Sequence, residues 1–165
     1  MTIKPRLMFR VATVPVFLAL TLAAAPAVYA DEPVNGQGHS TVSLVPVAEH
    51  TADGNTFIDY TFTETFSGFV EGTRVGAGTL VIHPDGSLNS ANDGIFTGSI
   101  AGSSGTAEIH VSVEGTFAGA VANFTVTNGT GGLAGVHAQG TDHGSATGPT
   151  SLAGTYTIKV NFSAS

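Results

Sequence analysis

The stretch Phe57-Ile-Asp-Tyr-Thr-Phe-Thr-Glu-Thr-Phe66 alternates apolar and polar residues and decides the fold class. An alternation with period two is typical of a β-strand that buries one face and exposes the other. The apolar face carries Ile58, Tyr60, Phe62 and Phe66, and the opposite face carries Thr61, Thr63 and Thr65. The stretch therefore predicts a half-buried strand in an antiparallel sheet.

The same alternation recurs along the rest of the chain. Further strands are expected at about 75–83, 94–100, 106–117, 121–127, 136–142 and 156–162, with a polar loop over 143–151. No segment shows a helical stripe, and the abundant Gly and Thr residues disfavour helix interiors. Seven or eight short strands predict an all-β barrel or sandwich. If the last strand pairs with the Phe57 strand, no edge stays open, which favours a closed antiparallel barrel of about eight strands.

The first thirty residues have the pattern of a signal peptide. Lys4, Arg6 and Arg10 precede an apolar run, and Val28-Tyr29-Ala30 matches a cleavage site. We expect residues 1–30 to be removed after Ala30 and the protein to be secreted or periplasmic. Residues 31–56 are interpreted as a polar N-terminal arm in which 41–47 could add one edge strand, and residues 57–165 as the barrel domain.

Charge excludes several classes of partner. After cleavage only Arg74 and Lys159 remain basic against twelve acidic residues, a formal charge of −10. So few cations cannot neutralise a nucleic-acid backbone or bind an anionic membrane surface. No second apolar run approaches the ~20 residues that span a bilayer. The chain has no Cys, and an exported protein without disulfides is more typical of bacteria.

A series of short Gly- and Thr-containing motifs resembles an uncharacterised bacterial domain family. That family opens with a Phe-Ser-Gly-x-x-Glu-Gly strand and turn, which resembles Phe66-Ser-Gly-Phe-Val-Glu-Gly72. The other matching stretches are 76–78, 85–86, 105–110, 115–117, 128–135, 140–141 and 154–156. Together they cover roughly 57–162, nearly the whole mature domain.

The corner Gly129-Thr-Gly-Gly-Leu-Ala-Gly135 also resembles allene oxide cyclases and dirigent proteins. This resemblance implies an eight-stranded antiparallel barrel with a largely apolar lumen. Members of those families steer reactive small molecules to one cyclised or coupled product. None of their catalytic residues can be placed on this chain, so the resemblance implies a fold rather than an activity.

Glu64 is the first candidate catalytic residue. Its position in the alternation places it on the apolar face with Tyr60, Phe62 and Phe66. A carboxyl group there would be desolvated, which raises its pKa and suits a general acid or base. The alternative is a bulge near Gly68 that turns Glu64 outward.

Glu108 and His110 are two residues apart on one expected strand, so both side chains point to the same side. They are a candidate acid–base pair. The alternative is that Ile109, Val111 and Val113 form the core face, which would place Glu108 and His110 in solvent.

The remaining polar residues match no recognised catalytic or binding motif. The six His residues form no metal-binding motif, so no metal is expected. Gly129-Thr-Gly-Gly-Leu-Ala134 has the letters of a dinucleotide fingerprint, but no helix follows it, and no cofactor is expected. No Gly-x-Ser-x-Gly motif supports a hydrolase. Glu71 and Arg74, three residues apart, could form an exposed pair, which would contribute little to stability.

The leading functional hypothesis is that the lumen binds a small apolar molecule. The expected lining is Tyr60, Phe62, Phe66, Phe124 and Tyr156, with Val126, Ile158 and Phe162 as partners. One alternative is a cofactor-free cyclase or isomerase that uses the lumen as a mould. The other is a surface or interaction protein with a solid core, because the same residues would also fill a small barrel.

Overall fold

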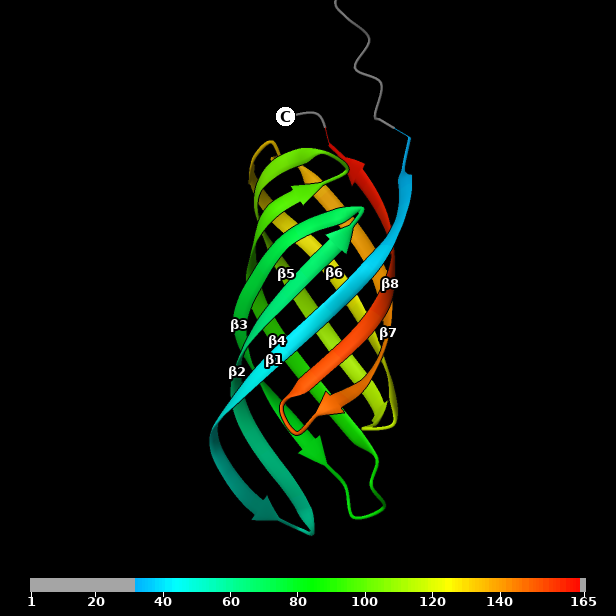
Figure 1. Ribbon diagram of the computed structural model, residues 1–165. Coiled ribbons are helices and arrows are strands. Elements are labelled where there is room, and N and C mark those ends of the chain that lie inside the picture. Colours follow the sequence, from blue (N-terminus) through cyan, green and yellow to red (C-terminus); the bar gives the residue numbers. More distant parts are fainter. Residues whose placement is uncertain (1–31, 164–165) are drawn as a thin grey trace, which may run out of the picture.

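The computed structural model describes residues 32–163, which form eight β-strands (Figure 1). The signal peptide predicted over 1–30 lies outside the described residues. The strands are β1 (Val34–Ala52), β2 (Asn55–Gly68), β3 (Val70–Ile82), β4 (Leu88–Ile100), β5 (Ser103–Thr116), β6 (Gly119–Gly131), β7 (Val136–Gly148) and β8 (Ser151–Phe162). Within 32–163, no helix is long and apolar enough to cross a membrane.

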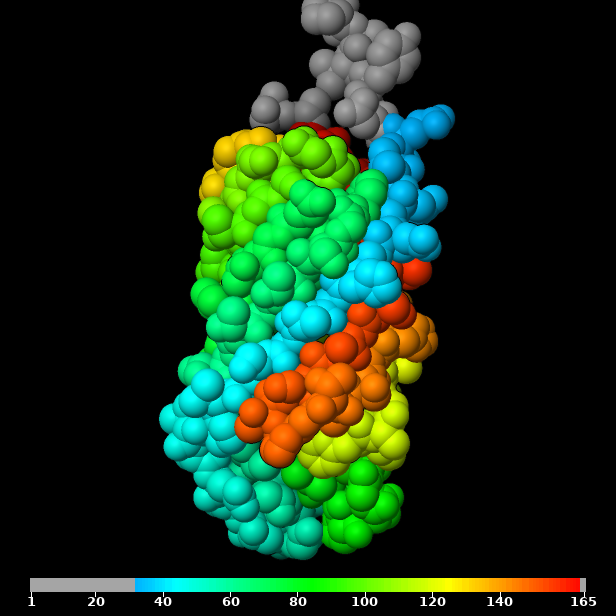
Figure 2. Space-filling model, viewed as in Figure 1, coloured from blue at the N-terminus to red at the C-terminus, as the bar shows by residue number. Residues whose placement is uncertain are grey.

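The strands close into one ring. Each strand pairs antiparallel with the next in sequence, and β1 pairs with β8, so the sheet is a closed barrel. The expected all-β antiparallel barrel of about eight strands is therefore confirmed at the level of strand number, direction and closure. Figure 2 shows β1 and β8 side by side across one face of the elongated body.

β1 is the main departure from the expected strands. Residues 34–52 form a 19-residue strand rather than a polar arm with one short edge strand. β1 pairs with β8 from Val34 to Ser43 and with β2 from Gly38 to Ala52. The expected pairing of the last strand with the Phe57 strand is therefore wrong, because β1 lies between β8 and β2 and pairs with both.

The first part of β1 was not predicted from the sequence because glycine occupies positions where apolar side chains would mark a strand. Its inward-facing positions carry Gly36 and Gly38 instead of large apolar residues. A Cβ at Gly36 would lie 2.0 Å from the ring of Phe69, and one at Gly38 would lie 2.3 Å from the Tyr156 hydroxyl. Aromatic side chains from β8 and from the turn between β2 and β3 therefore fill the space that apolar side chains of β1 would otherwise occupy.

The expected polar loop over 143–151 is also wrong. β7 continues to Gly148 and β8 begins at Ser151, so two residues connect them. The inward positions here are again small, including Gly144, Ala146 and Gly154. Small inward residues remove the apolar signal without removing the strand.

One half of the lumen is tightly packed. Its side chains come from β2 to β8 and from the corner between β6 and β7, and several are fully buried. The central members are Phe96, Ile100, Leu133, Val136, Tyr156 and Val160. Phe66 packs edge-on against both Phe96 and Tyr156, with ring centroids 6.0 and 5.7 Å apart. This half holds the barrel together by apolar burial.

Candidate functional site

The other half of the lumen contains a cavity of about 150 Å³. All eight strands contribute to its wall, and it extends toward the turns that carry Phe117 and Pro149. Its apolar wall includes Leu44, Phe62, Leu80, Leu88, Val113 and Leu152. An engineered apolar cavity of about this volume accommodates one benzene molecule, which sets the scale for an occupant here.

A buried ion pair lies at the inner end of this cavity. Glu64 and Arg74 are directly opposite each other on β2 and β3, and both face the lumen. Arg74 Nε is 2.8 Å from Glu64 Oε2, and the two side chains are 9% and 4% exposed for Glu64 and Arg74 respectively. The contact is an ion pair without the alignment of a hydrogen bond, so neither atom has a hydrogen-bond partner.

Other polar groups hold the Arg74 guanidinium in place. Its Nη2 donates to Asn92 Oδ1 at 2.9 Å, and Nη1 makes a long bond to the Ile109 carbonyl at 3.4 Å. The guanidinium carbon lies 4.5 Å from the centre of the Phe62 ring, within the range of a cation–π contact. Several contacts therefore fix the position of this one buried cation.

The polar chain continues along the cavity wall. Asn92 Nδ2 donates to the Tyr60 hydroxyl at 3.2 Å, and that hydroxyl lies 2.7 Å from Ser90 Oγ. Ser90 Oγ in turn donates to the Thr79 carbonyl at 2.9 Å. These bonds satisfy the polar atoms of Tyr60 and Asn92, which are both buried.

Burial dominates the electrostatics of the pair. It raises the pKa of Glu64 to about 7, although Arg74 opposes this rise, and the nearby Asp142 adds to it. Burial also lowers the pKa of Arg74, against the effect of Glu64. A carboxyl group that titrates near neutral pH and faces a cavity can give or take a proton there.

A second carboxylate, Asp142 on β7, also lines the cavity. Ser40 Oγ donates to Asp142 Oδ2 at 2.5 Å, whereas the buried Oδ1 has no hydrogen-bond partner. A Cβ at Gly154 would lie 2.1 Å from Oδ1, so glycine at this position makes room for the carboxylate. Burial raises the pKa of Asp142, with Ser40 and His143 acting in the opposite direction.

The structure brings most of the expected lining residues together. Tyr60, Phe62, Phe66 and Phe124 all border the cavity. Tyr156 instead belongs to the packed half, where its hydroxyl accepts a 2.8 Å hydrogen bond from the Val70 amide. The expected partners Val126 and Ile158 lie in the packed half as well, and Phe162 packs against it.

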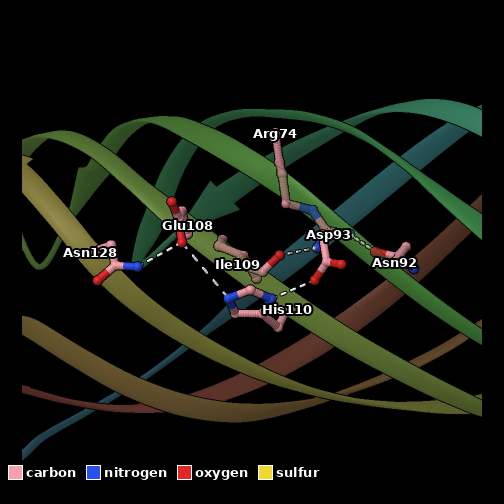
Figure 3. Close-up of polar contacts among 7 residues, drawn as sticks. All are labelled: Arg74, Asn92, Asp93, Glu108, Ile109, His110 and Asn128. Carbon is pink, nitrogen blue, oxygen red and sulfur yellow. Dashed lines mark hydrogen bonds and ion pairs between the residues drawn. The ribbon is translucent and has the colours of Figure 1, made fainter.

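Glu64 faces the lumen as the alternation predicted, but Glu108 and His110 do not. Ile109 is buried while His110 is exposed, so the outward alternative holds for this strand (Figure 3). On the outer surface His110 Nδ1 contacts Asp93, its Nε2 lies 3.9 Å from Glu108 Oε2, and Asn128 donates to Glu108 at 2.7 Å. The Glu108–His110 pair thus lies outside the cavity and cannot reach a molecule in it.

Arg74 does not form the expected exposed pair with Glu71. It is 3% exposed and faces the lumen. The turn at Gly68 sets a register in which Glu64 opposes Arg74, and the position of that turn was the signal that could have identified the pair. Asn92 and Asp142 were missed because each lies in a polar segment with no apolar alternation around it, and Ser40 was missed because it lies just before the alternation of Val42 and Leu44.

In residues 32–163, no group of three or more His, Cys, Asp or Glu side chains is arranged to hold a metal ion. The polar groups of the lumen instead form pairs and short chains of hydrogen bonds. The fold and the cavity together define a small antiparallel β-barrel with a polar cluster between a packed and a hollow half of its lumen.

Comparisons with known proteins support the fold. The chain matches no protein-family model, and no curated protein matches its sequence. It is similar in structure to a protein of unknown function from the DUF3224 family of Shewanella oneidensis MR-1, with a TM-score of 0.65 and 17% sequence identity. The similarity covers 81% of this chain and 100% of the other. It agrees with the expected likeness to an uncharacterised domain family, while the likeness to allene oxide cyclases stays a prediction.

Proposed function

We propose that the protein is exported and binds a small, mainly apolar molecule in the hollow half of the barrel lumen. The observation that carries this proposal is the cavity of about 150 Å³ between the Glu64–Arg74 pair and one end of the barrel. Apolar side chains dominate its wall, as in most small-molecule sites, and a few polar groups converge at one end. The pattern at the N-terminus supports export.

Two further points support a ligand over a solid core. A barrel of eight strands has an interior just large enough for side chains or for one small ligand, and half of this interior is left open. The resemblance of the 129–135 corner to allene oxide cyclases and dirigent proteins favours the same reading, since their lumens hold small molecules. The solid-core alternative leaves the cavity without a role.

Native mass spectrometry of the protein purified from its own secretion medium tests this proposal. We expect an added mass that disappears on denaturation. In the matched variants, Ala122→Leu adds a side chain inside the cavity, and Val121→Leu adds one methylene on the outer face. Ala122→Leu should lose the added mass and Val121→Leu should keep it. No added mass, together with no uptake of any member of a lipophilic dye panel, would reject the proposal in favour of the solid-core alternative.

A second candidate function is a cofactor-free cyclase or isomerase. Glu64 favours it, because its pKa of about 7 would let it transfer a proton to a molecule in the cavity. Once a ligand is known, Glu64→Gln separates the two functions. Loss of turnover with retained binding would support the enzyme, whereas a ligand recovered unchanged from the wild-type protein would leave binding alone.

A further inference from the structure

The charged groups of the cavity point to the chemistry of its ligand, and this inference rests on the proposed binding function. Among residues 32–163, three charged side chains line the cavity: the carboxylates of Glu64 and Asp142 and the guanidinium of Arg74. With all three ionised, the cavity has one negative charge in excess. A cationic ligand would neutralise it, and an anionic ligand would add to it.

Arg74 is poorly placed to receive an anion. Its guanidinium already contacts Glu64, Asn92 and the Ile109 carbonyl, and the Phe62 ring lies against it. Because Glu64 is 2.8 Å away from Arg74 Nε, an anion approaching this cation would also approach a carboxylate. The single cation of the cavity is thus largely neutralised within the barrel itself.

One carboxylate oxygen of Asp142 has no hydrogen-bond donor within the barrel. Its Oδ2 accepts the Ser40 hydrogen bond, but its Oδ1 is buried and unpartnered, and so is Glu64 Oε2 apart from the misaligned contact with Arg74. An unsatisfied buried acceptor costs the desolvation of that group, about 1–3 kcal/mol. A donor brought in by a ligand would remove this cost, and a protonated amine does so with a charge-assisted bond.

We infer that the ligand is a small amine, with an ammonium group that donates to Asp142 and an apolar body that fills the hollow half of the lumen. The cavity volume limits that body to about one aromatic ring or an aliphatic group of similar size. Glu64 offsets the charge of Arg74, so the charge of Asp142 is left to attract the ammonium group.

Three probes with the same ring test the inference. Benzylamine, toluene and benzoate differ in the charge of one substituent, and their affinities at pH 7.5 can be measured by calorimetry or by NMR titration. We expect benzylamine to bind about tenfold more tightly than toluene, which corresponds to one charge-assisted hydrogen bond. Benzoate should bind more weakly than toluene.

Two variants test whether the preference for benzylamine depends on Asp142. Asp142→Asn keeps the size of the side chain and removes its charge, so it should reduce the affinity for benzylamine to that for toluene and leave toluene unchanged. Asp93→Asn, at an exposed carboxylate on the outer surface, is the matched control and should change neither affinity. If Asp142→Asn does not fold, the comparison of probes on the wild-type protein still decides.

The outcomes separate this inference from the function on which it rests. Equal binding of toluene and benzylamine, or tightest binding of benzoate, would overturn the amine inference while leaving the binding function intact. Preferential benzylamine binding that survives Asp142→Asn would overturn the assignment to Asp142. Failure of all three probes, with no added mass in native mass spectrometry, would reject the binding function itself.

Discussion

The two halves of the lumen are enclosed by the same eight strands, yet one is packed and the other hollow. In the packed half, Phe96, Leu133 and Tyr156 are at most 1% exposed and fill the space between opposite strands. In the hollow half, inward positions on β6 and β7 carry small residues such as Ala122, Gly144 and Ala146. A closed sheet therefore does not dictate a solid interior. The size of the inward-facing side chains determines whether the interior is packed or hollow.

Strand β7 shows this change within one element. Its inward positions run from Val136 and Ala138 in the packed half, through Asp142, to Gly144 in the hollow half. The polar cluster lies where the side chains change from large to small. We propose that apolar burial at one end of these strands stabilises the barrel and that the other end binds the ligand, and mutations can test that division.

The largest expected effect is in the packed half. Phe96→Ala removes a fully buried ring and should lower the free energy of unfolding by about 3–5 kcal/mol. Leu80→Ala, on the wall of the existing cavity, should cost only about 1–2 kcal/mol because Leu80 is half-buried and borders empty space. Urea denaturation of both variants measures the difference. Equal losses would show that the two halves are packed alike.

Removing one partner of the ion pair should cost slightly less. Arg74→Met leaves Glu64 buried without its cation, and we expect a loss of about 3 kcal/mol at pH 8. The double variant Glu64→Leu with Arg74→Met removes both charges and should recover most of that loss. If the double variant is as unstable as Arg74→Met, the cost comes from packing around Arg74 rather than from the unpaired carboxylate.

Glu64 should make stability depend on pH. Its pKa is raised from 4.5 to about 7 on folding, so the folded state holds this proton over a range in which the unfolded state has lost it. The contribution is therefore fully present below pH 4.5 and is lost as the pH rises through 7, on the order of 3 kcal/mol. Asp142, whose pKa is also raised, acts in the same direction.

Denaturation curves between pH 4 and 8 check this prediction. Glu64→Gln should flatten the decline, and Glu108→Gln, at a carboxylate on the outer surface, should leave it unchanged. A wild-type stability that rises steadily from pH 4.5 to 7 would contradict a buried Glu64 with a raised pKa.

The smallest effect is expected on the outer surface. Asp93 and His110 form an exposed pair, and such pairs contribute about 0–1 kcal/mol. Asp93→Asn should therefore change the free energy of unfolding by about 0.5 kcal/mol or less, and the change should shrink in high salt. A loss comparable to that of Arg74→Met would mean that the outer cluster is more than a solvated contact.

Alternation alone predicted the strands whose inward side chains are large. The Phe57–Phe66 stretch placed Glu64 inside correctly, because Tyr60, Phe62 and Phe66 define its buried face. The alternation did not predict the first half of β1 or the end of β7, because glycine faces the lumen in both segments. A pattern of hydrophobicity cannot detect an inward position that has no side chain.

The polar cluster was harder to predict than the fold. Glu64 and Arg74 are ten residues apart, and their contact depends on the register set by the turn at Gly68. Asp142 reaches the cavity from β7 because Gly154 of β8 leaves space for its carboxylate. The Glu64–Arg74 contact follows from a local hairpin, whereas the position of Asp142 in the cavity depends on the packing of β7 against β8 and cannot be predicted from the local alternation.

The division of the lumen can be tested directly by titrating toluene into the protein and following its methyl groups by NMR. We predict that the resonances of Leu44, Leu80 and Leu88, which line the cavity, shift with added toluene, while those of Ile100, Leu133 and Val136 in the packed half stay in place. Shifts concentrated in the packed half, or no shifts at any methyl group, would contradict a barrel with one packed and one ligand-accessible half.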